Sequence, residues 1–161
     1  MNIIFLDVDG VLNSLPYCNK YPEEEISEYH VKMLAQLYNK VNAKIVLSST
    51  WRDCDHPDEP EVYKMYKYLL DMLNKYSMEI IDKIPVVNGD RPLEIKTWAT
   101  EHNCSTYISL DDDFNYEDYK AYGIENHLIQ TKFFCNTIQE GGIQQRHVDE
   151  AIKKFEIMNK M

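Results

Sequence analysis

The sequence predicts an α/β fold with a mostly parallel sheet that helices flank on both faces. Short, mainly apolar runs such as Ile3–Leu6 and Ala43–Leu47 are typical of strands buried on both faces of such a sheet. Between these runs, apolar residues recur at the spacing of amphipathic helices. Strands and helices therefore alternate along the chain, which is the order that strand–helix–strand units produce.

In the first half of the chain, three elements follow the strand Ile3–Leu6. Residues 27–41 place their apolar side chains on one stripe of a helix. The run Ala43–Leu47 favours a second strand, which ends abruptly in polar residues. A second helix should reach about Tyr76, because Pro57 and Pro60 suit its first turn and apolar residues recur at helical spacing after them.

The next elements are a short strand and a helix. The strand is expected at Ile80–Ile81 or at Ile84–Val87, before a turn at 88–90. Pro92 suits the first turn of a helix that ends near His102.

The last third of the chain predicts two more strands and a helix. Tyr107–Leu110 and His127–Gln130 favour strands, and the glycines at 141 and 142 separate them from a final amphipathic helix. We expect residues 1–161 to form one domain, because this length is about that of a single hydrophobic core.

Composition and charge exclude several classes of protein. A 44% hydrophobic and 27% charged composition is that of a packed fold. The formal net charge of −10 repels polyanions, so we expect no extended nucleic-acid-binding surface. No apolar run approaches the ~18 residues of a membrane helix, and no secretory leader is evident, so we expect no membrane partner. The four cysteines form no CxxC pair, which favours reduced thiols and a cytoplasmic location. The oligomeric state stays open.

Acidic and hydroxyl residues follow three of the predicted strands. Asp7 and Asp9 follow the first strand, Ser48 and Ser49 the second, and Asp111–Asp113 the strand near residue 110. Ligands in open α/β sheets bind beyond the carboxyl ends of the strands, so these clusters should converge. Crowded carboxylates need a cation, and oxygen ligands suit Mg²⁺, which leaves room for a phosphate oxygen. The sequence therefore predicts phosphoryl chemistry.

These motifs resemble those of a known superfamily. "DVDGV" after an apolar strand, a strand ending in serine, a basic residue before a helix and a strand ending in "DD" resemble the four motifs of the haloacid dehalogenase (HAD)-like phosphatases. "LSSTWR" and "RPLEIKTWATEHNCSTYISLDDD" are similar, more narrowly, to the small HAD domains grouped with RNA-repair proteins. The resemblance covers residues 3–113 and implies a HAD-like, Rossmannoid fold. With only about 40 residues between the first two motifs, a large cap domain is not expected there.

The resemblance also implies roles for the first motif. Asp7 would be the nucleophile that becomes an aspartyl phosphate, and one of its oxygens would also bind Mg²⁺. Asp9 would be the general acid and base, and its main-chain carbonyl a second ligand of the ion. Gly10 would let the chain turn sharply after the strand.

The other motifs imply phosphate and metal ligands, some with alternatives. For the hydroxyl that holds the phosphoryl group we favour Ser49, with Ser48 as the alternative because it directly follows the strand. For the cation, Arg91 matches the third motif and Lys96 is the alternative. In the fourth motif, Asp112 would bind Mg²⁺ directly, with Asp111 in support and Asp113 either a water-mediated ligand or solvated.

The predicted function is a Mg²⁺-dependent phosphomonoester hydrolase that acts through an aspartyl phosphate. Asp9 argues against a dehalogenase, since a halide leaving group needs no proton. An uncapped site would admit a small molecule, a phosphoprotein, a nucleotide or a nucleic-acid end, and the RNA-repair resemblance favours the last two. A HAD-type phosphotransferase and a catalytically silent HAD-fold binding module are the alternatives. A phosphorylation-receiver domain is disfavoured, because serines stand where its acceptor acid would be.

Each motif also has a purely structural interpretation. Asp7 and Asp9 alone could form a turn or part of a calcium loop, and Ser48 and Ser49 could cap a helix. Trp51 is expected to pack in the core, with the substrate mouth as the alternative.

Overall fold

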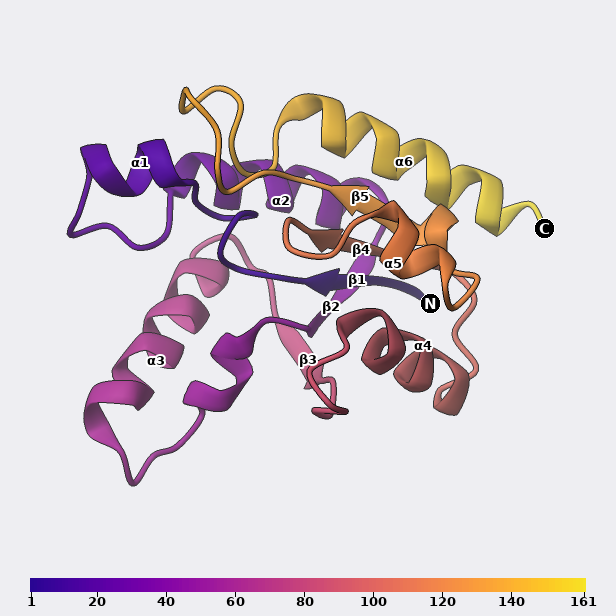
Figure 1. Ribbon diagram of the computed structural model, residues 1–161, viewed down its shortest axis with the longest axis horizontal. Coiled ribbons are helices and arrows are strands. Elements are labelled where there is room, and N and C mark those ends of the chain that lie inside the picture. The colour runs from indigo at the N-terminus through magenta and orange to yellow at the C-terminus, as the bar shows by residue number, and fades with distance from the viewer.

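Five parallel strands form one sheet in the computed structural model, which describes residues 1–161 (Figure 1). In the sheet the strands stand in the order β3-β2-β1-β4-β5, so β1 lies at the centre. Their bounds are β1 Asn2–Leu6, β2 Ala43–Leu47, β3 Ile80–Lys83, β4 Tyr107–Asp111 and β5 Leu128–Gln130. All four pairings are parallel, which confirms the predicted fold class. The short strand takes the first of its two expected positions, and Ile84–Val87 as a strand was wrong.

Six α-helices and two short 3-10 helices accompany the strands, and all but the last, α6, lie between two strands. They are α1 Leu15–Lys20, α2 Glu28–Lys40, η1 Thr50–Cys54, α3 Pro60–Asn74, α4 Arg91–Glu101, α5 Tyr116–Lys120, η2 Glu125–His127 and α6 Gln145–Asn159. The four long helices match the predicted ones, although α3 begins at Pro60 and not at Pro57. The sequence did not predict α1 or α5, because six and five residues are too few to show a helical stripe. None of the helices combines the length and apolar character needed to cross a membrane.

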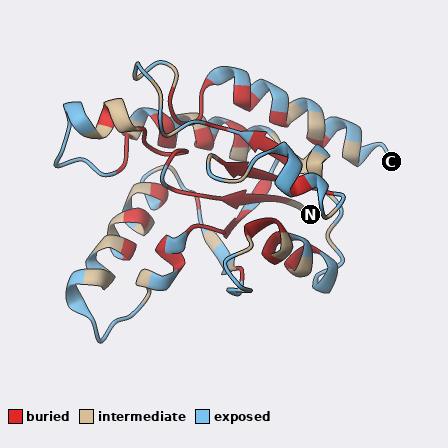
Figure 2. Cartoon of the chain, viewed as in Figure 1, coloured by how far each residue is buried: buried red, intermediate tan, exposed pale blue.

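Each face of the sheet carries its own hydrophobic core. In Figure 2 the strands are largely red, whereas the outward faces of the helices are pale blue. On one face, α2, α3 and α6 pack against Ile4 and Leu6 of β1; on the other, α4 and α5 pack against Ile3 and Phe5. Successive side chains of a strand point to opposite faces. Asp7, which follows β1, therefore continues the row of Ile3 and Phe5 on the α4 side.

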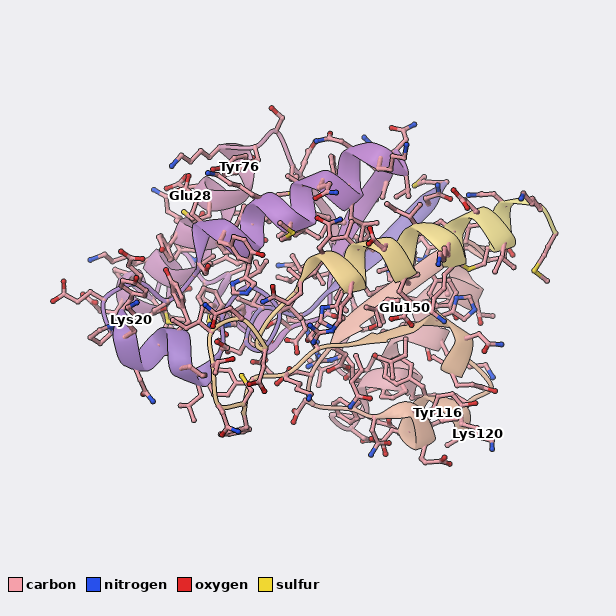
Figure 3. All side chains as sticks on the ribbon, turned by 90° about the horizontal axis from the view of Figure 1, so that it is seen from above. Lys20, Glu28, Tyr76, Tyr116, Lys120 and Glu150 are labelled. Carbon is pink, nitrogen blue, oxygen red and sulfur yellow. The ribbon has the colours of Figure 1, made fainter.

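Helices α2 and α3 are joined at the surface of the larger core. Lys75 Nζ lies 2.8 Å from Glu28 Oε1, and the Tyr76 hydroxyl donates to the same carboxylate. Figure 3 shows Tyr76 beside Glu28. These contacts link the end of α3 to the first turn of α2.

No large cap domain interrupts the fold. Between β1 and α2 the only helix is α1, and between β3 and β4 the only one is α4. The carboxyl ends of β1, β4 and β5 point toward the side of the molecule where α1 and the loop between β5 and α6 lie (Figure 1). This end of the sheet carries the residues singled out from the sequence.

Candidate active site

Three polar residues stand side by side at the carboxyl ends of three neighbouring strands. Leu6 pairs in register with the residues that precede Ser48 and Asp111, so Asp7, Ser48 and Asp111 occupy the next row. The ladder continues to this row, because Ser48 N–H donates to Leu6 O at 2.9 Å and Asp7 N–H donates to Leu110 O at 3.2 Å. Parallel pairing puts the three side chains on one face of the sheet, the face that α4 covers.

Asp7, Asp111 and Asp112 form a carboxylate cluster. One oxygen of each lies within 4.8 Å of the others. Asp111 is fully buried; its Oδ1 accepts the N–H groups of the second and third residues after it, and its Oδ2 accepts the Tyr119 hydroxyl at 2.8 Å. These bonds fix Asp111 behind the site, whereas Asp112 lines the pocket beside Asp7.

The cluster has the charge state of a site for a hard cation. Burial raises the pKa of Asp7 well above its usual range, and the Arg91 guanidinium opposes this shift. Burial also raises the pKa of Asp111 and that of Asp112 to about 6. Three desolvated carboxyls beside a single guanidinium favour proton uptake or a divalent ion with oxygen ligands. The residues therefore fit Mg²⁺.

Two side chains hold Asp9: Asn13, which the sequence did not single out, and Trp51, for which the substrate mouth was the alternative to core packing. Asn13 Nδ2–H donates to Asp9 Oδ1 at 2.9 Å, and Trp51 Nε1–H donates to Asp9 Oδ2 at 3.1 Å. Asn13 also accepts the Gly10 N–H at 2.9 Å, which closes the turn after β1. Trp51 is buried and lines the pocket, so it packs and also contacts the expected proton donor.

The two serine candidates have different surroundings. Ser49 Oγ accepts the Trp51 N–H at 3.1 Å and caps η1. Ser48 Oγ is buried, has no hydrogen-bond partner and lies in the row of Asp7. Thr50, which the sequence analysis did not select, lines the pocket.

The two candidates for the cation, Arg91 and Lys96, differ in burial and in the residues that they contact. Arg91 begins α4 and is buried, with Nη1 at 3.8 Å from Asp7 Oδ2. Lys96 is exposed, donates to Tyr122 O at 2.8 Å and does not line the pocket. The structure thus brings Arg91, and not Lys96, to the carboxylate cluster.

Asp7, Asp9, Arg91 and Asp112 open onto one cavity of about 520 Å³, which neither Ser48 nor Ser49 lines. Its volume is within the range of sites for small organic ligands. Its wall includes the charged residues Asp7, Asp9 and Arg91 and the apolar residues Met65 and Phe133. The cavity can therefore hold an anionic group at the carboxylate cluster and a larger organic group beside it.

Gly10 allows the close approach of Asp112 to the first motif. Its φ is +82°, and a Cβ atom there would lie 2.1 Å from Asp112 Cγ. Gly89 has a similar φ of +68° with nothing within 4 Å of its Cβ position. Both glycines adopt a positive φ that disfavours other residues, but only at Gly10 would a Cβ atom also clash with a neighbouring side chain.

We expect Gly10→Ala to displace Asp112, whereas Gly89→Ala should cost only the backbone strain of about 1 kcal/mol. Isothermal calorimetry with Mg²⁺ should show affinity lowered roughly 10-fold or more in Gly10→Ala. Thermal unfolding of both variants measures the shared strain. Equal Mg²⁺ affinity in the two variants would contradict this placement of Asp112.

Comparison with known proteins agrees with the site. The family model described as the HAD domain in Swiss Army Knife RNA repair proteins matches residues 3–136. The match spans the first strand, the serine segment, Arg91 and the acidic pair at the end of β4. No curated protein and no solved structure gives a match. Since the matched residues make up most of the chain, the protein belongs to the family of HAD domains found in Swiss Army Knife RNA repair proteins.

Proposed function

We propose that the protein is a Mg²⁺-dependent phosphomonoester hydrolase that acts through an aspartyl phosphate on Asp7. The observation that carries this proposal is the convergence of Asp7, Asp112 and Arg91 around one cavity whose wall also holds Asp9. A nucleophile, a proton donor and a cation are the groups that phosphoryl transfer to a carboxylate requires.

In the proposed first step, an Asp7 carboxylate oxygen attacks phosphorus and the ester P–O bond breaks. Asp9 gives its proton to the departing oxygen, so an alcohol leaves. In the second step Asp9 takes a proton from water, the water oxygen attacks phosphorus, and the acyl phosphate P–O bond breaks. Orthophosphate leaves and the Asp7 carboxylate is restored. Trp51 and Asn13 orient Asp9 in both steps.

Mg²⁺ would be held by Asp7, Asp112 and the main-chain carbonyl of Asp9, with Asp111 in support. When bound, it neutralises charge on the phosphoryl oxygens and on the carboxylates. The carbonyl of Asp9 accepts no backbone hydrogen bond, which leaves it free for this role. Arg91 adds a fixed positive charge beside Asp7.

For the substrate we propose a nucleotide or a nucleic-acid terminal phosphate. Three observations support this class: the apolar part of the cavity, the absence of a large cap, and the RNA-repair proteins in which the family occurs. Five acidic residues and one arginine line the cavity, which disfavours a second phosphate inside it, as a nucleoside triphosphate would place there. The four free cysteines support a reducing, cytoplasmic location. We propose no membrane partner and no extended nucleic-acid surface.

The proposal is tested with p-nitrophenyl phosphate, nucleoside 3′- and 5′-monophosphates, nucleoside triphosphates and end-phosphorylated oligonucleotides, with and without Mg²⁺. We expect Mg²⁺-dependent release of orthophosphate, with monophosphates or oligonucleotide ends preferred over triphosphates. Added alcohols distinguish the phosphotransferase alternative, in which a phosphorylated alcohol replaces orthophosphate. No turnover of any substrate with Mg²⁺ would leave the catalytically silent binding module as the better interpretation.

Ser48 and Ser49 should respond differently to alanine. Because the Ser48 hydroxyl is unpartnered and lies beside Asp7, we expect Ser48→Ala to raise KM for p-nitrophenyl phosphate about 10-fold with little loss of stability. Ser49→Ala removes the η1 cap and should cost about 1 kcal/mol of unfolding free energy. Steady-state kinetics and thermal unfolding separate the two effects. A KM change confined to Ser49→Ala would restore the sequence-based preference.

Mg²⁺ should stabilise the protein more at pH 7 than at pH 5. Asp111 and Asp112 have folded pKa values of about 6, above the unfolded value of ~3.9. Their protonation therefore favours folding below about pH 4, and this contribution is lost as the pH rises through 6. At pH 7 these carboxyl groups are deprotonated, and Mg²⁺ can bind them and stabilise the folded state. At pH 5 protons occupy the carboxyl groups and compete with Mg²⁺.

The measurement is the unfolding midpoint with Mg²⁺ minus that with EDTA, at each pH. At ~100-fold excess over Kd we expect a rise of roughly 6 °C at pH 7. His147 has a pKa lowered to about 4, so it destabilises the fold on acidification, but it cancels in this difference. Asp112→Asn should abolish the rise. An equal rise at both pH values would contradict the carboxylate site.

A further inference from the structure

Two buried arginines share one buried glutamate behind the carboxylate cluster. Glu94 is 1% exposed, and its Oε1 accepts Arg52 Nη2–H at 3.1 Å and lies 3.9 Å from Arg91 Nε. Its Oε2 accepts the Val87 N–H at 2.6 Å. Both oxygens of the carboxylate are thus engaged, so Glu94 has one fixed position.

A continuous chain of contacts runs from the serine segment to the nucleophile. Arg52 Nη1–H donates to Ser48 O at 2.5 Å, and Arg52 also pairs with Glu94. Glu94 faces Arg91, whose Nη1 lies 3.8 Å from Asp7 Oδ2. Glu94 therefore connects the segment after β2 with the start of α4, and both with Asp7.

In this series of contacts the positive charges outnumber the negative charge of Glu94, and some guanidinium N–H groups have no acceptor. Two guanidinium groups meet one carboxylate, which leaves one positive charge for the cluster at Asp7. Arg91 Nε and Nη1 are buried and have no hydrogen-bond partner. Buried donors without partners are costly, and guanidinium N–H groups match the oxygens of a phosphoryl group. Arg91 is therefore poised to bind an anion next to Asp7.

We propose that Glu94 is a positioning residue for the phosphoryl group. It does not touch the substrate; it lies on the Nε side of the Arg91 guanidinium and holds that group at a distance from Asp7, so that the unpartnered Nη1 on the Asp7 side is available to the phosphoryl oxygens. Through Arg52, Glu94 also fixes the position of the Ser48 main chain relative to Arg91. Without the Glu94 charge, Arg91 turns toward Asp7 and pairs with the nucleophile. This inference rests on the proposed function.

A double-mutant cycle tests whether Glu94 acts through Arg91. The proteins are wild type, Glu94→Gln, Arg91→Ala and the double variant, with Glu101→Gln as a control from the exposed end of the same helix. Glutamine keeps the shape of Glu94 and removes its charge. The readouts are kcat and KM for p-nitrophenyl phosphate, and the Kd of orthophosphate by calorimetry, below the unfolding midpoint of each protein.

We expect each single variant to lose about 100-fold in kcat/KM and to bind orthophosphate more weakly. The double variant should be no worse than Arg91→Ala, because the effect of Glu94 passes through Arg91. Glu101→Gln should match the wild type. Losses in the double variant that multiply to roughly 10⁴-fold would overturn the proposal, because independent effects add in free energy.

Chemical rescue of Arg91→Ala tests the same claim with Glu94 intact, in case Glu94→Gln does not fold. In Arg91→Ala, guanidinium ion from solution should bind next to Glu94 in the space left by the missing Arg91 side chain. Low-millimolar guanidinium, far below denaturing concentrations, should restore activity about 10-fold, and ammonium should not. Equal effects of the two cations would overturn the proposal.

These experiments distinguish failure of the proposed hydrolase function from failure of the proposed role of Glu94. A wild-type protein that binds orthophosphate but hydrolyses nothing rejects the proposed function alone, and the orthophosphate Kd values then complete the cycle. A wild-type protein that hydrolyses p-nitrophenyl phosphate but gives multiplying losses rejects the role of Glu94 alone. A protein that neither binds nor hydrolyses rejects both.

Discussion

Replacing Asp7 by asparagine is expected to lower kcat for p-nitrophenyl phosphate about 10⁴-fold or more. An amide is a poor nucleophile and cannot form the acyl phosphate, although it has nearly the same shape. The fold should persist, because burial opposes ionisation of the Asp7 carboxyl and asparagine removes that cost. The measurement is the steady-state rate with saturating Mg²⁺, together with the thermal unfolding midpoint.

Asp58→Asn is the matched control, since Asp58 is exposed in the turn before α3. It should keep the wild-type rate. If Asp7→Asn keeps a tenth or more of the activity after re-purification, the nucleophile is a different residue and the proposed mechanism is wrong.

Replacing Asp9 by asparagine should give a loss that depends on the leaving group. For alkyl phosphates, which release a basic alkoxide, we expect kcat/KM to fall about 10³-fold, because kcat/KM reports the first step. For p-nitrophenyl phosphate the first step needs no proton, so a burst of nitrophenolate should precede a slow second step. Stopped-flow absorbance measures the burst, and orthophosphate release measures the second step.

Trp51→Phe provides a graded comparison with Asp9→Asn. Phenylalanine fills much of the same space but lacks the Nε1–H that contacts Asp9 Oδ2. The loss in kcat/KM should again be larger for alkyl phosphates than for p-nitrophenyl phosphate, and smaller than the loss in Asp9→Asn. Equal losses in kcat/KM, which reports only the steps up to release of the alcohol, for both substrate types in Asp9→Asn would argue against Asp9 as the proton donor.

The sequence was sufficient to predict the parallel sheet and the end of it that carries the site. Buried strands have a local signature, and the first polar residue after each of them is visible in the sequence. Asp7, Ser48 and Asp111 could therefore be expected near one another before their pairing was known. Their order across the sheet also follows the strand order, which places β1 between β2 and β4.

Two choices needed the structure. Side-chain alternation and strand register put Ser48 beside Asp7, while the hydroxyl of Ser49 caps η1. Arg91 and Lys96 stand five positions apart on α4, which at 3.6 residues per turn turns them well away from each other. The spacing of a sequence motif does not show on which face of a strand or helix each side chain lies.

Two contacts at the site could not be predicted from the sequence because their partners are distant in the chain. Trp51 contacts Asp9, and Arg52 contacts Glu94, each across 42 positions. The sequence of α4 has no pronounced amphipathic stripe, so nothing local marks Glu94 as a buried charge. Only the packing of α4 against the segment after β2 reveals its partners.

Trapping the covalent intermediate is the most direct test of the account. Asp9→Asn protein is mixed with p-nitrophenyl phosphate and Mg²⁺, quenched within the burst, and reduced with borohydride, which converts an aspartyl phosphate to homoserine. Peptide mass spectrometry then locates the modified residue. We expect homoserine in place of Asp7 and unmodified aspartate elsewhere. A burst of nitrophenolate with unmodified Asp7, or with the modification at another residue, would contradict the central claim.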